Sequence, residues 1–374
     1  HLYIVDSFGN IDVEYFTNQF LVGTPTIGNF DLDNNLEIAF SGISQNSKLF
    51  VINSDTTWVD GFPLEINQHV FSGVSVADFN GNELDDIVMG TNDGNLYLIY
   101  DNGQIASGFP VQTGGGIKSD PVIADIIGDS HLEILFGNDN GEFICLNSNG
   151  EIQFNLDVSG PIKTSPAIIE HNNSIKIFFG TIEGTLYGIS PLGNELIGWP
   201  KFYNQDIYVS PVFSDLNGDG SPEIISSTKT GEYIINDLYG IPFYNVPLIT
   251  GIITESQSTV FDLDNDGDLE IFIGNQNGLT GLDIKFQGHI NNWNMFKGNN
   301  SRTGFSEISS SSTYLGDTNL DGIINVLDIL LLLNHILYDT ELSELGLVNA
   351  DFNNDDLINV SDIVLIVQLI LNDY

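Results

Sequence analysis

The chain repeats one acidic pattern six times, and this repeat limits the fold more than any other feature of the sequence. The acidic residues that open the copies are Asp31, Asp78, Asp125, Glu170, Asp215 and Asp262. Successive copies begin 47, 47, 45, 45 and 47 residues apart. A period of this length is typical of repeat architectures, in which each copy is one supersecondary unit that packs against its neighbours.

Each period contains four short apolar runs, which predict four β-strands. In the fifth copy the expected strands are Ser210–Phe213, Glu223–Ser227, Glu232–Asn236 and a run from Ile241 towards Val246. β-branched and aromatic residues fill these runs, and Gly, Asn and Asp separate them. Four strands in about 45 residues indicate one blade of a β-propeller. A helical solenoid would require an apolar period of 3.6 residues, which the repeats lack.

A second series of apolar runs sets the number of blades. These runs end at Asp6, Asn53, Asp101, Asn147, Ser190, Asp237 and Asp283. This series has seven members and the acidic series has six, so residues 1 to about 20 supply only the last two strands of a blade. The last blade is expected to be completed near Lys285 to Phe296.

We therefore predict a mainly β fold: a seven-bladed β-propeller of four-stranded blades over residues 1–305, with an incomplete first blade. Its opening strands are expected in sequence upstream of His1, where an export signal would also lie, because the N-terminus has no signal-peptide pattern. A six-bladed ring with an added N-terminal β-ribbon is the alternative.

The acidic loops have the composition of calcium sites. Carboxylates and amides alternate along them, and Ca²⁺ takes about 6–8 oxygen ligands. Without a cation, several carboxylates so close together would repel one another. The expected ligands in the sixth loop are Asp262, Asp264, Asp266 and Glu270. Those in the fifth are Asp215, Asn217, Asp219 and Glu223. Those in the second are Asp78, Asn80, Asn82 and Asp86.

The other three loops fit the pattern less well. The first, with expected ligands Asp31, Asp33, Asn35 and Glu37, reads as two residues shorter. The third has Ile127 where a ligand is expected, and the fourth has Lys176 in place of the final carboxylate. We therefore predict three or four Ca²⁺ ions in the propeller, in the second, fifth, sixth and first copies and not in the fourth. The alternative is ordinary Asx-rich turns without ions.

These loops resemble the FG-GAP/VCBS repeats of integrin-type β-propellers. The Gly-Phe-Pro sequences at residues 61–63 and 108–110, and Gly-Trp-Pro at 198–200, resemble the same family. The resemblance covers about residues 1–300. It implies calcium ions between the first two strands of a blade, and it does not identify a ligand for the propeller.

A different pattern begins after a Ser-rich linker at residues 306–314. Residues 317–328 and 351–362 each fit a twelve-residue EF-hand loop, and an apolar helical run follows each one. In such a loop the seventh residue binds through its backbone carbonyl. The expected ligands of the first loop are Asp317, Asn319, Asp321, Ile323, Asn325 and Asp328. Those of the second are Asp351, Asn353, Asp355, Leu357, Asn359 and Asp362.

Two such loop–helix units 34 residues apart, over residues 315–374, resemble a type I dockerin. Asp328 and Asp362 match this family, which uses Asp at the last ligand. The resemblance implies two Ca²⁺ ions and a cohesin-type partner. Val326-Leu327 and Val360-Ser361 depart from the Ser/Thr pairs of cellulosomal dockerins. The partner is therefore a non-cellulosomal cohesin or an adjacent domain, and the alternative is a structural helix pair packed on the propeller.

Charge excludes two classes of partner. The chain has 51 acidic and nine basic residues, a formal net charge of −42. Nucleic acid and anionic membranes both require cationic surfaces. The longest apolar stretch, residues 329–333, is also far too short to span a membrane. We therefore expect neither nucleic-acid binding nor membrane insertion.

Catalysis finds little support in the sequence. The six histidines show no metal-ligand spacing, and no Gly-x-Ser-x-Gly sequence is present. We predict a secreted or cell-surface, calcium-binding, non-catalytic region whose propeller binds an extracellular protein or polysaccharide. The alternatives are a polysaccharide lyase or glycoside hydrolase built on a propeller, and a purely structural calcium-stabilised repeat module.

Overall fold

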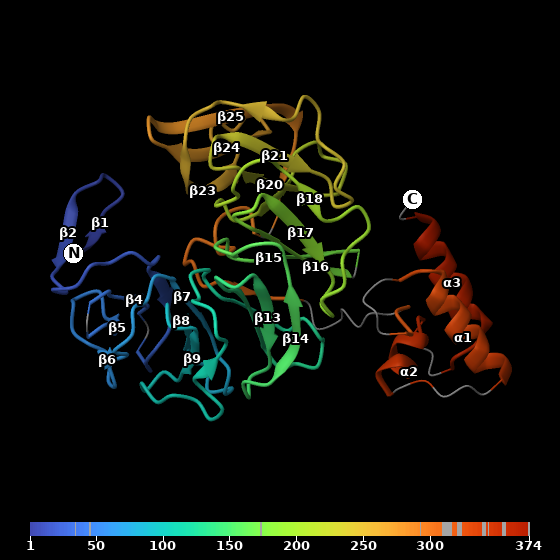
Figure 1. Cartoon of the computed structure of the whole chain (residues 1–374), viewed down its shortest axis with the longest axis horizontal. Helices are drawn as coiled ribbons and strands as arrows, with labels where there is room; N and C mark the ends of the chain where they lie inside the picture. The colour runs from blue at the N-terminus through green and yellow to red at the C-terminus, as the bar shows by residue number, and fades with distance from the viewer. Residues whose placement is uncertain are drawn as a thin grey trace.

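The computed structural model describes residues 1–372 except for a few positions and short segments. These are residues 34, 45, 173, 292, 309–315, 320–323, 339–341, 343 and 354–356. In the described part of the chain the strands form seven separate sheets, and three helices follow them (Figure 1). The chain is therefore mainly β with a small α-helical C-terminal module.

Five of the sheets contain the four strands that the repeat predicts, in chain order and antiparallel. The first is β3 (Thr26–Gly28), β4 (Glu37–Ser41), β5 (Lys48–Ile52) and β6 (Leu64–Glu65). The second is β7 (Val74–Ala77), β8 (Asp86–Gly90), β9 (Asn95–Ile99) and β10 (Val111–Gln112). The third is β11 (Val122–Ala124), β12 (Glu133–Gly137), β13 (Glu142–Leu146) and β14 (Ile152–Asp157). The fourth is β15 (Ala167–His171), β16 (Ser174–Gly180), β17 (Thr185–Ile189) and β18 (Lys201–Phe202). The fifth is β19 (Val212–Asp215), β20 (Glu223–Ser227), β21 (Glu232–Asn236) and β22 (Leu248–Ile249).

Two sheets have fewer strands. The N-terminal sheet is β1 (Leu2–Val5) and β2 (Ile11–Tyr15), which fits both an incomplete first blade and an added β-ribbon. The sixth repeat forms β23 (Thr254–Phe261), β24 (Asp268–Asn275) and β25 (Gly278–Gln287). In Figure 1 the sheets follow one another around a common centre, from β3–β6 to β23–β25.

The structure corrects two of the expected strands. The fourth strand of the fifth repeat is β22, and not the run from Ile241 to Val246, where only Pro242 forms an isolated bridge. The described part of the segment from Lys285 to Phe296 adds no fourth outer strand to the sixth sheet, because its first residues end β25 and Met295 bridges to Thr259 of the innermost strand. Instead, β26 (His289–Ile290) pairs with β19 of the fifth sheet.

The segment 289–306, here called the strap, crosses the middle of the molecule. Five of its carbonyl oxygens accept hydrogen bonds of 2.8–3.0 Å from backbone N–H groups of the sheets. The acceptor and donor pairs are Trp293 with Phe213, Asn294 with Val260, Ser301 with Ile27, Thr303 with Val76, and Gly304 with Ile123. Strap strand β27 (Phe305–Ser306) also pairs in parallel with β11. Each of these partners lies on the first strand of a sheet. The strap therefore joins the innermost strands of five sheets.

A relay of hydrogen bonds also links neighbouring sheets. The backbone N–H of Gly73 donates to Asp120 Oδ1 at 2.6 Å, and that of Asp120 donates to Ser165 Oγ at 3.1 Å. The N–H of Ser165 donates to Ser210 Oγ at 2.9 Å, and that of Ser210 to Gln257 Oε1 at 2.6 Å. These five residues occupy the same position in successive repeats. The relay therefore satisfies buried backbone donors that lie between blades.

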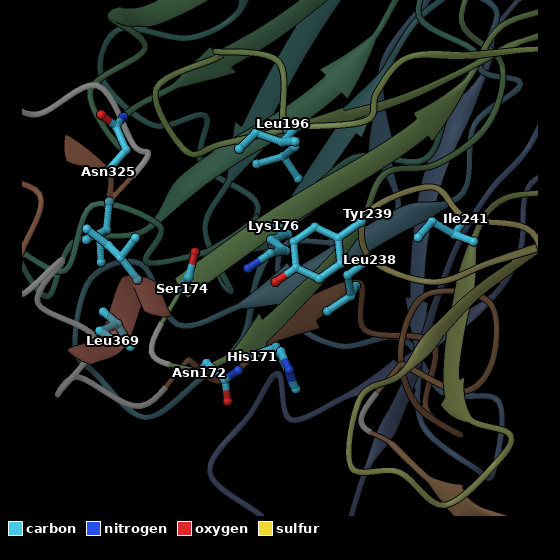
Figure 2. Close-up of a pocket in the computed structure, with 13 residues that line it drawn as sticks. His171, Asn172, Ser174, Lys176, Leu196, Leu238, Tyr239, Ile241, Asn325 and Leu369 are labelled. Carbon is cyan, nitrogen blue, oxygen red and sulfur yellow. The ribbon is translucent and has the colours of Figure 1, made fainter. Parts of the chain in front are cut away.

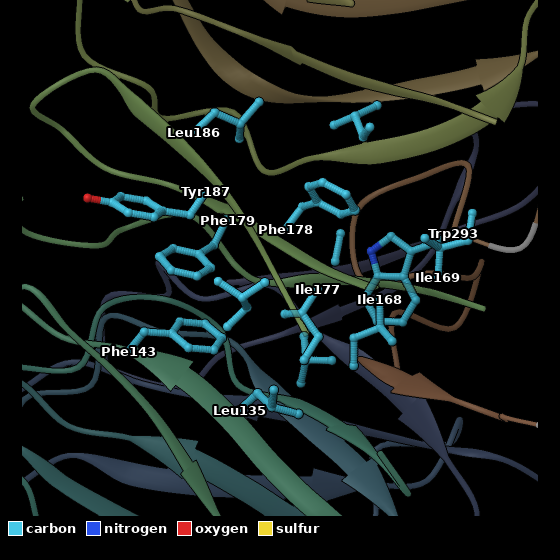
Figure 3. Close-up of a cluster of buried hydrophobic side chains, with 14 of the residues drawn as sticks. Leu135, Phe143, Ile168, Ile169, Ile177, Phe178, Phe179, Leu186, Tyr187 and Trp293 are labelled. Atoms are coloured by element: carbon cyan, nitrogen blue, oxygen red, sulfur yellow. The ribbon is translucent and has the colours of Figure 1, made fainter. Parts of the chain in front are cut away.

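The main core lies between neighbouring sheets, because the middle strands are buried on both faces. Phe143 of β13 stacks on Phe179 of β16 with ring centroids 4.0 Å apart, and Phe179 stacks on Tyr187 of β17 (Figure 3). Trp293 of the strap joins the same cluster beside Ile168 of β15. Sheet-to-sheet packing and the strap thus share one hydrophobic core.

The Gly-Phe-Pro sequences fit closely against the next repeat. Gly61 and Gly108 have φ of 88° and 91°, a conformation that side chains rarely adopt. A Cβ at Gly61 would lie 2.2 Å from the carbonyl oxygen of Asn102, and one at Gly108 would lie 2.1 Å from that of Asn149. The glycine is therefore required both by the backbone conformation and by contact with the following blade.

The C-terminal module contains α1 (Val326–Tyr338), α2 (Glu344–Ala350) and α3 (Val360–Asn372). The sequence predicted a helix after each of the two EF-hand-like loops, and α1 and α3 lie at these places. Leu332 of α1 and Ile366 of α3, which are 34 residues apart, form its buried centre with Ala350 of α2. The two loop–helix units therefore pack as equivalent halves around one small core.

Candidate metal centres

The acidic loops lie between the first and second strands of their sheets and share one hydrogen bond. In five of them the last carboxylate accepts the backbone N–H of the second loop residue, at 2.7–3.0 Å. The pairs are Glu37 with Phe30, Asp86 with Phe79, Glu133 with Ile126, Glu223 with Leu216 and Glu270 with Leu263. This bond turns the loop so that its polar side chains converge.

The first carboxylate of a loop also binds the backbone. Asp78 accepts hydrogen bonds from the N–H groups of Gly81 and Glu83, both at 2.7 Å. Asp215 accepts the equivalent bonds from Gly218 and Gly220, at 2.7 and 2.9 Å. Such Asx turns hold the loop in one conformation without using all the lone pairs of the carboxylate.

Strand register corrects the length of the first loop. Gly28 pairs with Glu37 in β3–β4, just as Ala77 pairs with Asp86 in β7–β8. The first loop therefore begins at Asn29 and is as long as the second. The sequence argument placed its start two residues too late, because it aligned the loops on their first acidic residue.

The first and sixth loops bring several carboxylates together. Oxygens of Asp31, Asp33 and Glu37 lie within 4.8 Å of one another. In the sixth loop the same holds for two overlapping sets, Asp262 with Asp264 and Glu270, and Asp266 with Asp268 and Glu270. The expected ligands of these two loops therefore converge, except for Asn35, whose side chain donates to Asp33 at 3.0 Å.

The second and fifth loops are closed by amide groups. Asn80 Nδ2 donates to both carboxylate oxygens of Asp86, at 3.3 and 3.2 Å. Asn217 Nδ2 donates to Asp219 at 3.0 Å and to Glu223 at 3.3 Å. An amide that presents its nitrogen to carboxylates can turn over and present its oxygen to a cation. These loops can thus be closed both with and without an ion.

The third and fourth loops differ. Asp125 and Glu133 of the third make the shared backbone bonds, but Ile127 stands between them as the sequence indicated. The fourth copy forms a tight hairpin in which His171 pairs with Ser174 and Ile169 with Lys176. Its side chains thus lack the geometry of the other loops.

Asp268 of the sixth loop is not among the ligands expected from the sequence. Its side chain is buried, and Lys285 Nζ donates to it at 3.2 Å and contacts Asp283 at 2.6 Å. No pattern in a single loop reveals Lys285, because it lies at the end of the third strand.

Burial without a counter-ion raises the pKa of several of these carboxyl groups. Desolvation is the largest cause, and it raises the pKa of Asp86 to about 7 and those of Glu133 and Glu223 to about 8. Backbone hydrogen bonds lower these pKa values in part, and neighbouring carboxylates raise them further. Without a cation, Glu133 and Glu223 are therefore mostly protonated at neutral pH, and a bound cation would favour the charged form of such carboxyl groups.

The donor sets fit a hard divalent cation. Glu37 Oε1, Asp262 Oδ1 and Asp268 Oδ1 are buried and make no hydrogen bond. Orphaned carboxylate oxygens of this kind are costly unless a cation or water binds them. Oxygen ligands in this number favour Ca²⁺ over transition metals.

The two C-terminal loops are built alike. Asp328 accepts hydrogen bonds from the N–H groups of Asn325 at 2.8 Å and Asn319 at 3.1 Å. Its counterpart Asp362 accepts those of Asn359 at 2.8 Å and Asn353 at 3.3 Å. Both carboxylates are fully buried, and each one ties the start of its loop to the end.

Asparagines begin the two main helices. The side-chain oxygens of Asn325 and Asn359 cap α1 and α3 by accepting the N–H groups of Leu327 and Ser361, at 2.7 and 2.8 Å. Asp317 is buried beside α2, where its carbonyl accepts a bond from Asn349 Nδ2 at 2.9 Å. The predicted ligands Asp321, Ile323 and Asp355 lie outside the described residues.

Each of these helices exposes the same apolar row. Val326, Leu330 and Leu337 are exposed along α1, and their counterparts 34 residues later along α3 are Val360, Val364 and Leu371. Exposed apolar side chains in a repeated row are typical of a surface that another protein covers.

Comparison with known families identifies this module. Residues 315–371 match the family described as Dockerin type I domain. The C-terminal module is a type I dockerin. Dockerins bind Ca²⁺, occur in secreted or cell-surface proteins, and dock to cohesins. The paired loops and the helix rows of this dockerin are therefore parts of a docking module.

The sheets have low similarity to solved structures. A complex of BBS1N with ARL6DN is 12% identical, covers 72% of this chain and 79% of that chain, and has a TM-score of 0.48. The V. cholerae biofilm matrix protein Bap1 is 15% identical, the match covers 70% of this chain and 51% of Bap1, and the TM-score is 0.49. BamB from Moraxella catarrhalis is 13% identical, the match covers 74% of this chain and 86% of BamB, and the TM-score is 0.44. The search of curated proteins gives no match.

A pocket of about 470 Å³ lies between the fourth and fifth sheets and the dockerin (Figure 2). His171, Lys176 and Tyr239 line one side, and Asn325 and Leu369 line the other. The pocket lies beside the fourth copy, whose loop lacks the acidic pattern.

Among the described helices, none has the length and apolar character needed to cross a membrane.

Proposed function

We propose that this chain is the calcium-dependent docking and ligand-binding region of a secreted or cell-surface protein. The main support is the duplicated dockerin unit, in which buried Asp328 and Asp362 close equivalent loops and equivalent helices expose equivalent apolar rows. Calcium would be held by the twelve ligands predicted in these two loops. It would fix the directions of α1 and α3 and so the surface offered to the partner.

The two rows allow a direct test of docking to a cohesin. Leu330→Asp and Val364→Asp each place a charge in one row without touching the core. If the rows are equivalent binding faces, each single variant retains binding and the double variant loses it. Leu279→Asp, at a site 70% exposed on β25, is the matched control. Binding is measured by calorimetry with calcium and again with EDTA. Unchanged binding of the double variant contradicts the proposal.

We propose three or four further Ca²⁺ ions in the propeller, bound by the second, fifth, sixth and first loops. The convergent carboxylates and their orphaned oxygens support this. Metal content after gel filtration, measured for the whole chain and for Asp264→Ala, tests the count. A chain that retains no calcium beyond that of the dockerin contradicts it.

We also propose that the sheets belong to a closed seven-bladed ring of the FG-GAP/VCBS type. Seven sheets in chain order, and the two-stranded sheet β1–β2, support this architecture. In that ring two further strands lie between β23 and β1. The exposed Tyr3 and Val5 support this, because their counterparts Tyr97 and Ile99 in β9 are buried.

We propose that the propeller binds and does not catalyse. Two carboxyl groups whose pKa burial raises into the neutral range, Asp86 and Glu223, belong to loops that we propose as calcium sites. Incubation with acidic and neutral polysaccharides, followed by assays for reducing ends and unsaturated uronates, tests this. Release of either product by the purified chain would favour a hydrolase or lyase instead.

A further inference from the structure

Two lysines and one tyrosine meet at the end of the sheets opposite the acidic loops. Lys163 precedes β15, Tyr208 precedes β19, and Lys229 lies in the turn between β20 and β21. Lys163 Nζ is 5.6 Å and Lys229 Nζ is 4.9 Å from the centroid of the Tyr208 ring. The acidic loop of the same sheet lies between the end of β19 and the start of β20. The cluster therefore occupies the opposite end of that sheet.

These lysines form no ion pair with any described carboxylate, although the chain is rich in acidic residues. Lys48, Lys118 and Lys285 each pair with carboxylates. In the described part of the chain, no carboxylate forms an ion pair with Lys163 or Lys229. With 51 acidic residues and nine basic ones, two adjacent ammonium groups left on an aromatic ring are an uncommon arrangement. Their charge is available to an external anion.

The repeat extends this cluster into a rim around the centre. The residues two positions before Gly73, Asp120, Ser165 and Ser210 of the hydrogen-bond relay are Phe71, Lys118, Lys163 and Tyr208. Phe71 is partly exposed, and its ring makes an edge contact with that of His69. A ligand lying across the rim would therefore meet aromatic faces as well as ammonium groups.

We propose that this rim binds a carboxylated polysaccharide, a chain of uronic acid residues, with Lys163 and Lys229 pairing with its carboxylates. Sugar rings offer both faces for aromatic contact and hydroxyls for Tyr208, whereas nucleic acid has a charge density that a chain of net charge −42 repels. This inference rests on the proposed binding role of the propeller and names its ligand class.

The test uses the full chain in calcium buffer and a galacturonic acid trimer, with its methyl ester as the uncharged control ligand. Lys163→Ala and Lys229→Ala should each weaken binding about twofold to fivefold, as expected for exposed charge pairs. Lys163→Arg should restore it. Lys201→Ala, on β18 away from the rim, is the matched control and should bind like the wild type. The ester should not bind.

Three results would overturn the inference. One is failure of the wild type to bind the trimer at millimolar concentration. Another is binding that the lysine variants leave unchanged, which would place the trimer at calcium in the acidic loops. The last is equal affinity for a glutamate peptide of the same charge, which would make the ligand a peptide. Cohesin binding, measured in parallel, separates these results from failure of the docking proposal.

Discussion

The buried ammonium of Lys297 donates hydrogen bonds to the carbonyl of Val74 on β7 and to Thr26 Oγ1 on β3 at 3.1 Å. Lys297 belongs to the strap, and the two acceptors belong to neighbouring sheets. The charge of Lys297 also interacts with that of buried Asp120. Removing one member of a buried charge pair leaves the other uncompensated and costs about 3–5 kcal/mol. We expect Lys297→Ala to destabilise the propeller by about this amount in chemical denaturation. Lys201→Ala is the control.

Stability near Lys297 should depend on pH in the alkaline range. Burial lowers the pKa of Lys297 from 10.5 to about 8, which the charge of Asp120 only partly offsets. Between these values the unfolded chain binds the proton and the folded chain does not, so unfolding free energy rises with pH. We expect wild type to gain stability relative to Lys297→Met from pH 8 to 10. A constant difference between the two proteins would contradict this.

Removing calcium should unfold the dockerin before the sheets. Among its described residues only three apolar side chains are fully buried, so we expect metal binding to contribute much of its folding free energy. Calcium at 100 times its Kd stabilises each site by about 2.7 kcal/mol. EDTA should therefore abolish the helical far-UV signal at a lower temperature than the β signal. A melting curve that EDTA leaves unchanged would rule this out.

The effect of Glu37→Gln on the melting temperature should depend on whether calcium is bound. Without the ion, Oε1 of Glu37 is an orphaned, buried charge near Asp31 and Asp33, and an amide there can donate to them. We expect the variant to melt higher than wild type in EDTA and to gain less when calcium is added. Glu65→Gln, at an exposed ion pair with Lys48, should melt like wild type in both buffers. The same shift in both buffers for Glu37→Gln would argue against an ion at this loop.

Breaking the hydrogen-bond relay between sheets should lower the free energy of unfolding by the amount expected for one unsatisfied buried donor. Ser210→Ala leaves the N–H of Ser165 without its acceptor, for about 1–3 kcal/mol. Ser107→Ala, at an exposed position, is expected to be neutral. Equilibrium denaturation of both variants checks the difference, and equal stabilities would show that water replaces the lost acceptor.

Features that depend on local sequence were predictable. The period gave the strands before and after each acidic loop, and capping asparagines at 325 and 359 fit helices that begin where expected. The position of the fourth strand in the fifth repeat was not predictable, since β22 is two residues long and is defined by its pairing with β21. The ligand assignments in the propeller remain predictions.

The strap could not be foreseen from the sequence. Residues 289–306 carry neither the repeat nor an alternating apolar pattern, and their hydrogen-bond partners lie up to 276 residues away. The register of the first loop was missed for a related reason. Asn29 occupies the place of the first aspartate, and only the pairing of Gly28 with Glu37 makes this visible.

The strap immediately precedes the linker that leads to the dockerin. Tension from a docked partner would therefore reach the sheets through residues 289–306 and not through the edge of one outer strand. The first strands of five sheets hold this segment by backbone hydrogen bonds. A pulling force on the dockerin would thus be shared among these sheets, and no single sheet would bear it alone.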